Sequence, residues 1–264
     1  MFFSRRERSV ARNRPPPGRS TKGAEMTRTH RIALVTGASR GLGLAVARLL
    51  AERGHHLVID ARGAADLERA RAALAPLTRV VALPGDVADA GHRLALVDAA
   101  WRMGGLDALV NNAGILGPSP MPAVDRLAPA DLERILLVNT VAPVALAQDA
   151  LPLLEASPFG GRVVNVTSDA AVEGYPLWGG YGAGKAALEA LSRSLAAERP
   201  DLRVHVVDPG DMRTRMHQEA FPGEDISDRP PPEESAPALV RLVEEDLPSG
   251  RWRAADLVAQ GAAR

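Results

Sequence analysis

The chain has 264 residues, enough for one large α/β domain with a substantial core. It carries 32 basic and 32 acidic residues, so no excess charge favours nucleic acid or an anionic membrane as a partner. Cysteine is absent, which excludes disulfide and thiolate chemistry and suits a cytoplasmic protein. No apolar run reaches the roughly 18 residues of a membrane span. The histidines show no metal-ligand spacing.

The N-terminal segment differs in composition from the rest of the chain. Six arginines fall between residues 5 and 19, beside a Pro-Pro-Pro-Gly run. Such a segment offers too little apolar surface to bury, so we expect a disordered basic extension over residues 1–28 and one folded domain over residues 29–264. Two alternatives stay open: Met26 is the true start, or the segment is a transit peptide, against which Glu7 and Glu25 count.

From residue 31 onward, apolar strands alternate with amphipathic helices. Strands are expected at residues 32–35, 56–60, 79–83, 107–110, 161–166, 202–207 and 251–257, and helices at residues 44–53, 67–77, 91–103, 129–154, 178–198 and 235–246. Pro143 is expected to bend the 129–154 helix, and residues 211–233 to form a loop or lid. This order predicts a single doubly wound, Rossmann-type α/β domain with a mostly parallel seven-stranded sheet.

A glycine-rich turn follows the first predicted strand. Residues 36–43 read Thr-Gly-Ala-Ser-Arg-Gly-Leu-Gly and precede an amphipathic helix. Glycines let the backbone approach a phosphate, and the free N–H groups of the following helix attract it. The spacing G-x-x-x-G-x-G differs from the commonest dinucleotide fingerprint, so the turn by itself also fits a tight βα connection without a ligand.

Other candidate site residues come directly after other predicted strands. They are Asp86, the Asn111-Asn112-Ala113-Gly114 turn, Ser168 and the Pro209-Gly210 pair. Ligands of an open parallel sheet bind beyond the carboxyl ends of its strands. We therefore expect these residues to line one cleft together with the glycine turn.

Tyr181 and Lys185 are four residues apart on a predicted helix and so share one of its faces. A phenol is a poor acid or base at neutral pH, but a nearby ammonium favours the phenolate and lowers the pKa. The pair therefore indicates a proton donor or acceptor. Ser168, at a strand end, has a hydroxyl that can hydrogen-bond a substrate carbonyl oxygen.

Taken together, these motifs resemble the short-chain dehydrogenase/reductase family. The resemblance covers Arg31 to about Thr214. It rests on Thr36-Gly37-x-x-x-Gly41-x-Gly43, Asp86, Asn111-Asn112-Ala113-Gly114, Asn139, Ser168, Tyr181-x-x-x-Lys185 and Pro209-Gly210-x-x-x-Thr214.

The resemblance implies a role for each of four catalytic positions. Tyr181 exchanges a proton with the carbonyl or alcohol oxygen, and Ser168 orients and polarises that group. Lys185 lowers the pKa of Tyr181 and holds the nicotinamide ribose. Asn139 sits in the helix before the fifth strand and holds a water that links Lys185 to solvent.

The resemblance also implies a nicotinamide dinucleotide cofactor, with adenine near Asp86 and Val87 and nicotinamide near Pro209, Gly210 and Thr214. The full set of expected cofactor contacts is Gly37, Ser39, Arg40, Gly41, Leu42, Gly43, Arg62, Asp86, Val87, Asn112, Ala113, Gly114, Tyr181, Lys185, Pro209, Gly210 and Thr214.

The end of the second predicted strand bears on the choice of cofactor. An acidic side chain there would bind the ribose 2′-hydroxyl, whereas arginines would bind a 2′-phosphate. Aligned on Gly54, the family's acidic position falls on Ala61, which leaves Asp60 on the other face, and Arg40 and Arg62 are nearby. NADP(H) is therefore favoured, and a one-residue slip that puts Asp60 on the ribose would favour NAD(H).

We therefore expect an oxidoreductase that transfers a hydride between NADP(H) and a ketone or secondary alcohol. A non-catalytic dinucleotide-binding sensor or scaffold is the alternative from another class, and epimerisation or dehydration ranks below both. The resemblance implies a homodimer or homotetramer with contacts through the helices at residues 129–154 and 178–198. The motifs do not identify the substrate, whose specificity depends on the loops at residues 115–127, 169–180 and 211–233.

Overall fold

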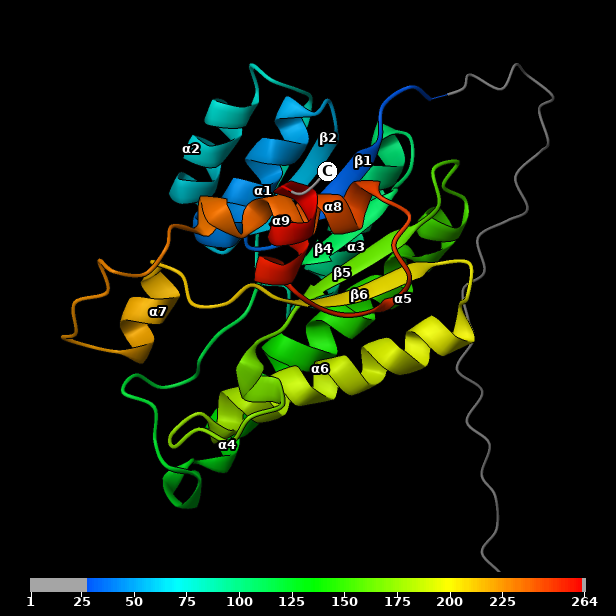
Figure 1. Ribbon diagram of the computed structural model, residues 1–264. Helices are drawn as coiled ribbons and strands as arrows, with labels where there is room; N and C mark the ends of the chain where they lie inside the picture. The colour runs from blue at the N-terminus through cyan, green and yellow to red at the C-terminus, as the bar shows by residue number, and fades with distance from the viewer. Residues whose placement is uncertain (1–27, 263–264) are drawn as a thin grey trace, which may run out of the picture.

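The computed structural model describes residues 28–262, so the predicted basic extension lies almost wholly outside the described residues (Figure 1). Its sheet has seven strands in the order β3-β2-β1-β4-β5-β6-β7, and every neighbouring pair is parallel. The strands are β1 (Ile32–Val35), β2 (His56–Ala61), β3 (Val80–Pro84), β4 (Ala108–Asn111), β5 (Arg162–Val166), β6 (Arg203–Asp208) and β7 (Gly250–Arg253). The strand order reverses between β1 and β4, which confirms the predicted doubly wound architecture.

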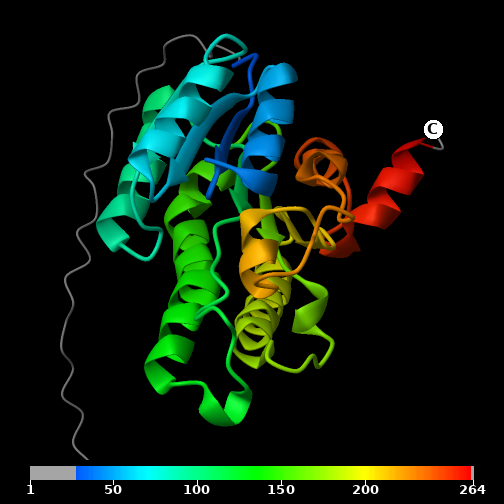
Figure 2. The same cartoon turned by 90° about the vertical axis from the view of Figure 1, so that its left-hand side faces the viewer.

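Helices cover both faces of this sheet (Figures 1 and 2). The α-helices are α1 (Gly41–Glu52), α2 (Ala64–Leu74), α3 (Ala90–Met103), α4 (Pro129–Leu136), α5 (Ala142–Glu155), α6 (Gly179–Glu198), α7 (Arg215–Ala220), α8 (Ala236–Glu244) and α9 (Ala254–Ala262). Strand side chains alternate between the faces: Ala33 and Val35 pack with α1, α2 and α8, whereas Ile32 and Leu34 pack with α3, α5 and α6. The continuous apolar character of the strands follows from burial on both sides.

The predicted 129–154 helix is interrupted. Helix α4 ends at Leu136, a π-helical turn (η2, Leu137–Val141) follows, and α5 begins at Ala142. Pro143 occupies the first turn of α5, where its missing N–H costs no helical hydrogen bond. The helix expected to bend at this proline is instead interrupted before it, and a new α-helix begins there. The π turn carries Asn139, as π turns in helices often carry functional residues.

The last predicted strand was placed too far along the chain. Strand β7 ends at Arg253, and residues 254–262 form α9 instead of continuing the strand to residue 257. Leu257 is buried in the core beside α8, so the apolar residues in this stretch reflect helix packing. Short apolar runs of this kind do not distinguish a strand from a buried helix.

Within residues 28–262, the stretch Pro129–Glu155 is long and apolar enough to span a membrane by composition alone, with a mean hydropathy of 1.4. Half of its most apolar 18 residues are buried inside the protein, where α5 packs on the sheet. Its apolar character is therefore used in the core.

A buried carboxylate fastens the amino ends of the central strands. Asp107, 3% exposed, accepts hydrogen bonds from the Ile32 amide (2.6 Å), the Ser157 hydroxyl (2.5 Å) and the Arg28 guanidinium (2.5 Å). Its own backbone pairs with Ile32 and with Arg162. Asp107 thus links β1, β4, β5 and the loop after α5.

We expect Asp107→Ala to lower the free energy of unfolding by about 3 kcal/mol, because it leaves the half-buried Arg28 guanidinium and two other donors without their acceptor. Urea unfolding followed by circular dichroism measures the change. Asp98→Ala is the matched control: its ion pair with Arg102 is exposed, and its loss should cost less than about 0.5 kcal/mol. Equal effects of the two substitutions would contradict the anchoring role of Asp107.

Candidate active site

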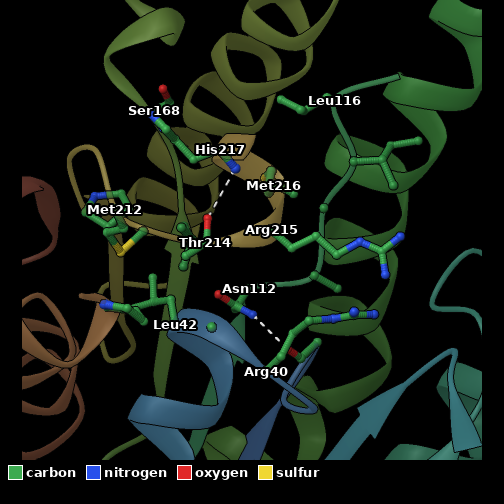
Figure 3. A pocket seen from close by; sticks show the side chains of 18 of the residues that line it. Arg40, Leu42, Asn112, Leu116, Ser168, Met212, Thr214, Arg215, Met216 and His217 are labelled. Carbon is green, nitrogen blue, oxygen red and sulfur yellow. Dashed lines mark hydrogen bonds between the residues drawn. The ribbon is translucent and has the colours of Figure 1, made fainter. Parts of the chain in front are cut away.

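A cavity of about 670 Å³ lies at the carboxyl ends of the strands. Figure 3 shows Arg40 and Leu42 at one end of it, Ser168 and Leu116 at the other, and the Thr214–His217 segment between them. Nearly all of the residues expected to bind cofactor line this cavity: Gly37, Ser39, Arg40, Gly41, Leu42, Arg62, Asp86, Val87, Asn112, Ala113, Gly114, Tyr181, Lys185, Pro209, Gly210 and Thr214. The structure thus gathers residues from the ends of five strands into one site.

The glycine turn has the backbone geometry of a phosphate cradle. Gly37 and Gly41 have φ values of 66° and 56°, which side chains rarely allow. The turn opens into α1, whose first-turn N–H groups have no helical partner. Gly43 departs from expectation because it does not line the cavity: a Cβ there would meet Asn112 Nδ2 and the Gly37 carbonyl at 2.5 Å. Its lack of a side chain serves packing behind the turn.

Asn112 holds the turn against β4. Its Nδ2 donates to the carbonyls of Thr36 (2.9 Å) and Gly37 (3.3 Å), and Thr36 Oγ1 accepts from the amides of Asn112 and Ala113. Asn112 therefore lines the cavity, and its side chain supports the glycine turn.

Asp60 is committed to protein partners. Its side chain is 1% exposed; Oδ1 accepts from the Gly37 amide at 2.8 Å, and Oδ2 lies 3.1 Å from His92 Nε2. The His92 ring lies where a Cβ of Gly85 would be, within 2.3–2.6 Å. Asp60 and the next two residues, Ala61 and Arg62, all line the cavity together with Arg40, whose side chain is half exposed.

The other wall at this end of the cavity is formed by Asp86 and Arg134. Arg134 Nη2 donates to Asp86 Oδ2 at 2.5 Å, and the Ala88 amide donates to Oδ1 at 2.9 Å. Burial raises the pKa of Asp86, but these two hydrogen bonds, together with the charges of Arg134 and Arg62, outweigh burial and leave the pKa below its usual value. Arg134 was not predicted, because its place in α4 is far from Asp86 in sequence.

Tyr181, Lys185 and Ser168 meet at the opposite end. Tyr181 and Lys185 lie on the same face of α6, with Lys185 Nζ 5.6 Å from the centre of the Tyr181 ring. Lys185 Nζ donates to the Val166 carbonyl at 2.8 Å, two residues before Ser168. Ser168 Oγ donates to Asp169 at 2.8 Å and accepts from the Ala170 amide at 3.2 Å.

Asn139 stands behind these residues and does not line the cavity. Its side chain exchanges two hydrogen bonds with the backbone of Ile115, at 2.9 and 2.8 Å. A Cβ on Gly114 would lie 3.3 Å from Asn139 Oδ1 and 3.5 Å from Lys185 Nζ, so the Gly114 backbone passes close to both. The four catalytic positions implied by the resemblance therefore converge.

The pKa values of the pair differ from the expectation that Lys185 lowers the pKa of Tyr181. Burial raises the pKa of Tyr181, and the carboxylates of Asp208 and Asp169 raise it further, against the opposing effect of a Ser168 hydrogen bond. Burial also lowers the pKa of Lys185 to about 8. Without a cofactor, Tyr181 is therefore a phenol at neutral pH.

An apolar cluster faces Tyr181. Leu116, Met121 and Ala170 pack with it, and Trp178, Met216 and Ala220 lie against the same cluster. Met216 and Ala220 belong to α7. The predicted lid thus contains a short helix that covers the tyrosine, but nothing in its sequence indicated which of its residues would do so.

Comparison with known proteins identifies the family to which this chain belongs. The sequence profile of the family described as short chain dehydrogenase matches residues 31–225. A yeast benzil reductase ((S)-benzoin forming) from Saccharomyces cerevisiae is 34% identical over 199 residues, which are 72% of this chain and 74% of the relative. Galactitol 2-dehydrogenase from Agrobacterium fabrum is 31% identical over 188 residues, covering 70% and 72%.

Solved structures agree in fold. A short chain dehydrogenase from Salmonella enterica serovar Typhi has a TM-score of 0.78 at 30% identity, covering 85% of this chain and 96% of that one. A protein from Escherichia coli CFT073 complexed with NADPH has a TM-score of 0.77 at 30% identity, with the same coverage. With its Rossmann-type sheet, its nucleotide cradle and its Ser-Tyr-Lys constellation, the chain belongs to the short-chain dehydrogenase/reductase family of oxidoreductases.

Proposed function

We propose that this protein is an NADPH-dependent oxidoreductase that interconverts a ketone and a secondary alcohol. The observation that carries the proposal is the meeting of Ser168, Tyr181 and Lys185 at one end of a cavity whose other end is a glycine cradle flanked by arginines. The cradle fits a dinucleotide because its positive-φ glycines leave the backbone open to a phosphate. The bound cofactor supplies the hydride, and the protein supplies orientation and the proton.

Each residue at the reacting end has a distinct task. Tyr181 keeps its proton at neutral pH, as a donor to a carbonyl oxygen must. Ser168 Oγ, which donates to Asp169 in the ligand-free site, would turn its hydrogen bond to the same substrate oxygen and share its developing charge. Lys185, fixed by the Val166 carbonyl, brings an ammonium to the tyrosine ring and to the sugar of a bound cofactor.

Substitution of Tyr181 by Phe tests this assignment. We expect ketone reduction to fall by about a thousandfold, because general acid catalysis contributes on that order. NADPH affinity, measured by fluorescence titration, should change less than about twofold, since a phenyl ring of the same shape remains. Retained turnover would refute Tyr181 as the proton donor, whereas lost cofactor binding would show a structural effect.

The preference for NADPH follows from the end of β2. Asp60 lines the cavity but is only 1% exposed, and its two oxygens already face Gly37 and His92, so we expect it not to bind a ribose 2′-hydroxyl. Arg40 and Arg62 line the cavity at this point, and guanidinium groups bind phosphate well. The named NADPH complex among the structural relatives supports the same choice.

We expect the double substitution Arg40→Ala, Arg62→Ala to weaken NADPH binding by about tenfold or more while NADH binding changes less than about twofold. Isothermal titration of each cofactor measures both constants. Arg48→Ala is the matched control, because Arg48 is exposed on α1 and pairs with Glu52 on the same helix. A wild-type protein that binds NADH more tightly than NADPH would overturn the cofactor assignment.

The apolar cluster around Tyr181 suits a ketone with a hydrophobic substituent. Leu116, Trp178 and Met216 of this cluster line the cavity and offer such a group an apolar surface, and the Trp178 ring meets that of Tyr181 edge-on at 5.6 Å. The yeast relative named as a benzil reductase supports this class of substrate. Aryl ketones are therefore the substrates to screen first.

A homo-oligomer is also proposed. Leu137, Val141 and Leu191 are 37%, 51% and 46% exposed and lie on the contacting segments η2 and α6. We expect a second copy of the chain to cover these side chains, because contiguous exposed apolar patches mark interaction sites. Light scattering should give a mass of two or four chains, and Val141→Glu with Leu191→Glu should lower it; a wild-type monomer would contradict the proposal.

A further inference from the structure

Three consecutive residues of the chain tie the end of β5 to α6. Asn165 Nδ2 donates to Ser192 Oγ (2.8 Å), the Val166 carbonyl accepts from Lys185 Nζ (2.8 Å), and Thr167 Oγ1 donates to Glu189 Oε1 (2.7 Å). The next residue is Ser168. These buried bonds fix the helix that carries Tyr181 against the strand that carries Ser168.

Glu189 is the acidic member of this set, and the proposed chemistry does not use it. It follows Tyr181 and Lys185 at a further four residues, on the same helix face, and its side chain is only 4% exposed. A buried carboxylate needs partners, and besides Thr167 it has Arg251 Nε, 3.0 Å from Oε1. Arg193 Nη1 lies farther away, 3.8 Å from Oε2.

Arg251 connects Glu189 to residues at the ends of two other strands. From β7 it donates through Nη2 to the Ser168 carbonyl at 3.3 Å and lies 3.5 Å from Asp208 Oδ2 at the end of β6. Arg251 therefore touches α6, Ser168 and β6 at once. A guanidinium suits this task because its donors form a rigid planar fork.

We infer that Glu189 and Arg251 are positioning residues, which hold Ser168 in register with Tyr181 through one ion-paired contact. The inference rests on the proposed function, because it assigns the pair a part in the same proton transfer. A buried ion pair is weak evidence for stability, but its directed bonds can specify geometry. Displacement of a reacting group by about 1 Å costs about a hundredfold in rate.

The pair also acts on the charge around Tyr181. Lys185 faces the ring from α6, Asp169 from the segment after β5, and Asp208 from β6. Arg251 and Arg253 of β7 oppose the charge of Asp208 and lower its pKa, although burial holds that pKa above its usual value. Loss of Arg251 leaves Asp208 less compensated, which favours the phenol and raises the pKa of Tyr181.

The experiment compares Arg251→Gln, Glu189→Ala and the double variant with wild type in full-length protein. We expect kcat to fall by about 10- to 100-fold in each single variant, with NADPH affinity unchanged within about twofold. The double variant should be no worse than the poorer single variant, because the two residues act as a unit. In Arg251→Gln, the alkaline midpoint of alcohol oxidation should move to higher pH, since Tyr181 must lose its proton to accept one.

Two further variants separate positioning from folding. Glu189→Gln keeps an acceptor for Thr167 and Arg251 and should recover kcat to within about threefold of wild type. Arg193→Gln removes a cation near Glu189 that contacts neither Ser168 nor Asp208, and it should behave as wild type. Wild-type kcat and pH profile in Arg251→Gln, or additive losses in the double variant, would overturn this inference alone. A wild-type protein that binds NADPH but turns over no ketone or alcohol would overturn the proposed function with it.

Discussion

The contact between α6 and the end of β5 is the constraint on which this molecule's site depends. Lys185 is buried yet keeps an ammonium-type donor directed at the Val166 carbonyl, so the helix cannot slide along the strand without stranding that donor. The same contact sets the distance between Tyr181, which comes from the helix, and Ser168, which follows the strand. Chemistry that needs two side chains from different elements thus depends on one buried polar seam.

The cofactor end obeys a different logic, because it uses backbone more than side chains. The cradle is a turn with two left-handed glycines, held by Asn112 from one strand and by Asp60 from another. Side chains here shape the turn, and the turn offers its amides to the ligand. The two ends of the cavity therefore tolerate different substitutions. The glycine turn restricts the size of a residue, whereas the reacting end restricts its chemical type.

Much of the fold was predictable because its signals are local. Apolar runs, the glycine turn and the Tyr181–Lys185 spacing are each recognised within a few residues of the sequence. What was missed depends on distant contacts. Arg134 reaches Asp86 from 48 residues away, and Arg251 reaches Glu189 from 62. The net rise in the pKa of Tyr181 was also missed, because the burial and the two carboxylates that cause it come from tertiary packing. The end of the last strand was predicted wrongly because an apolar residue such as Leu257 can belong to a strand or to a buried helix.

The lack of a side chain at Gly85 has a consequence for how this family member can change. The ring of His92 fills the space where a Cβ would stand, and that ring reaches Asp60, which in turn holds the Gly37 amide. Positions 37, 60, 85 and 92 therefore form one steric and hydrogen-bonded unit drawn from separate parts of the chain. In homologues, a larger residue at 85 should be accompanied by a smaller one at 92 and by a different residue at 60. Attempts to redesign cofactor choice at the end of β2 must treat these positions as one coupled variable.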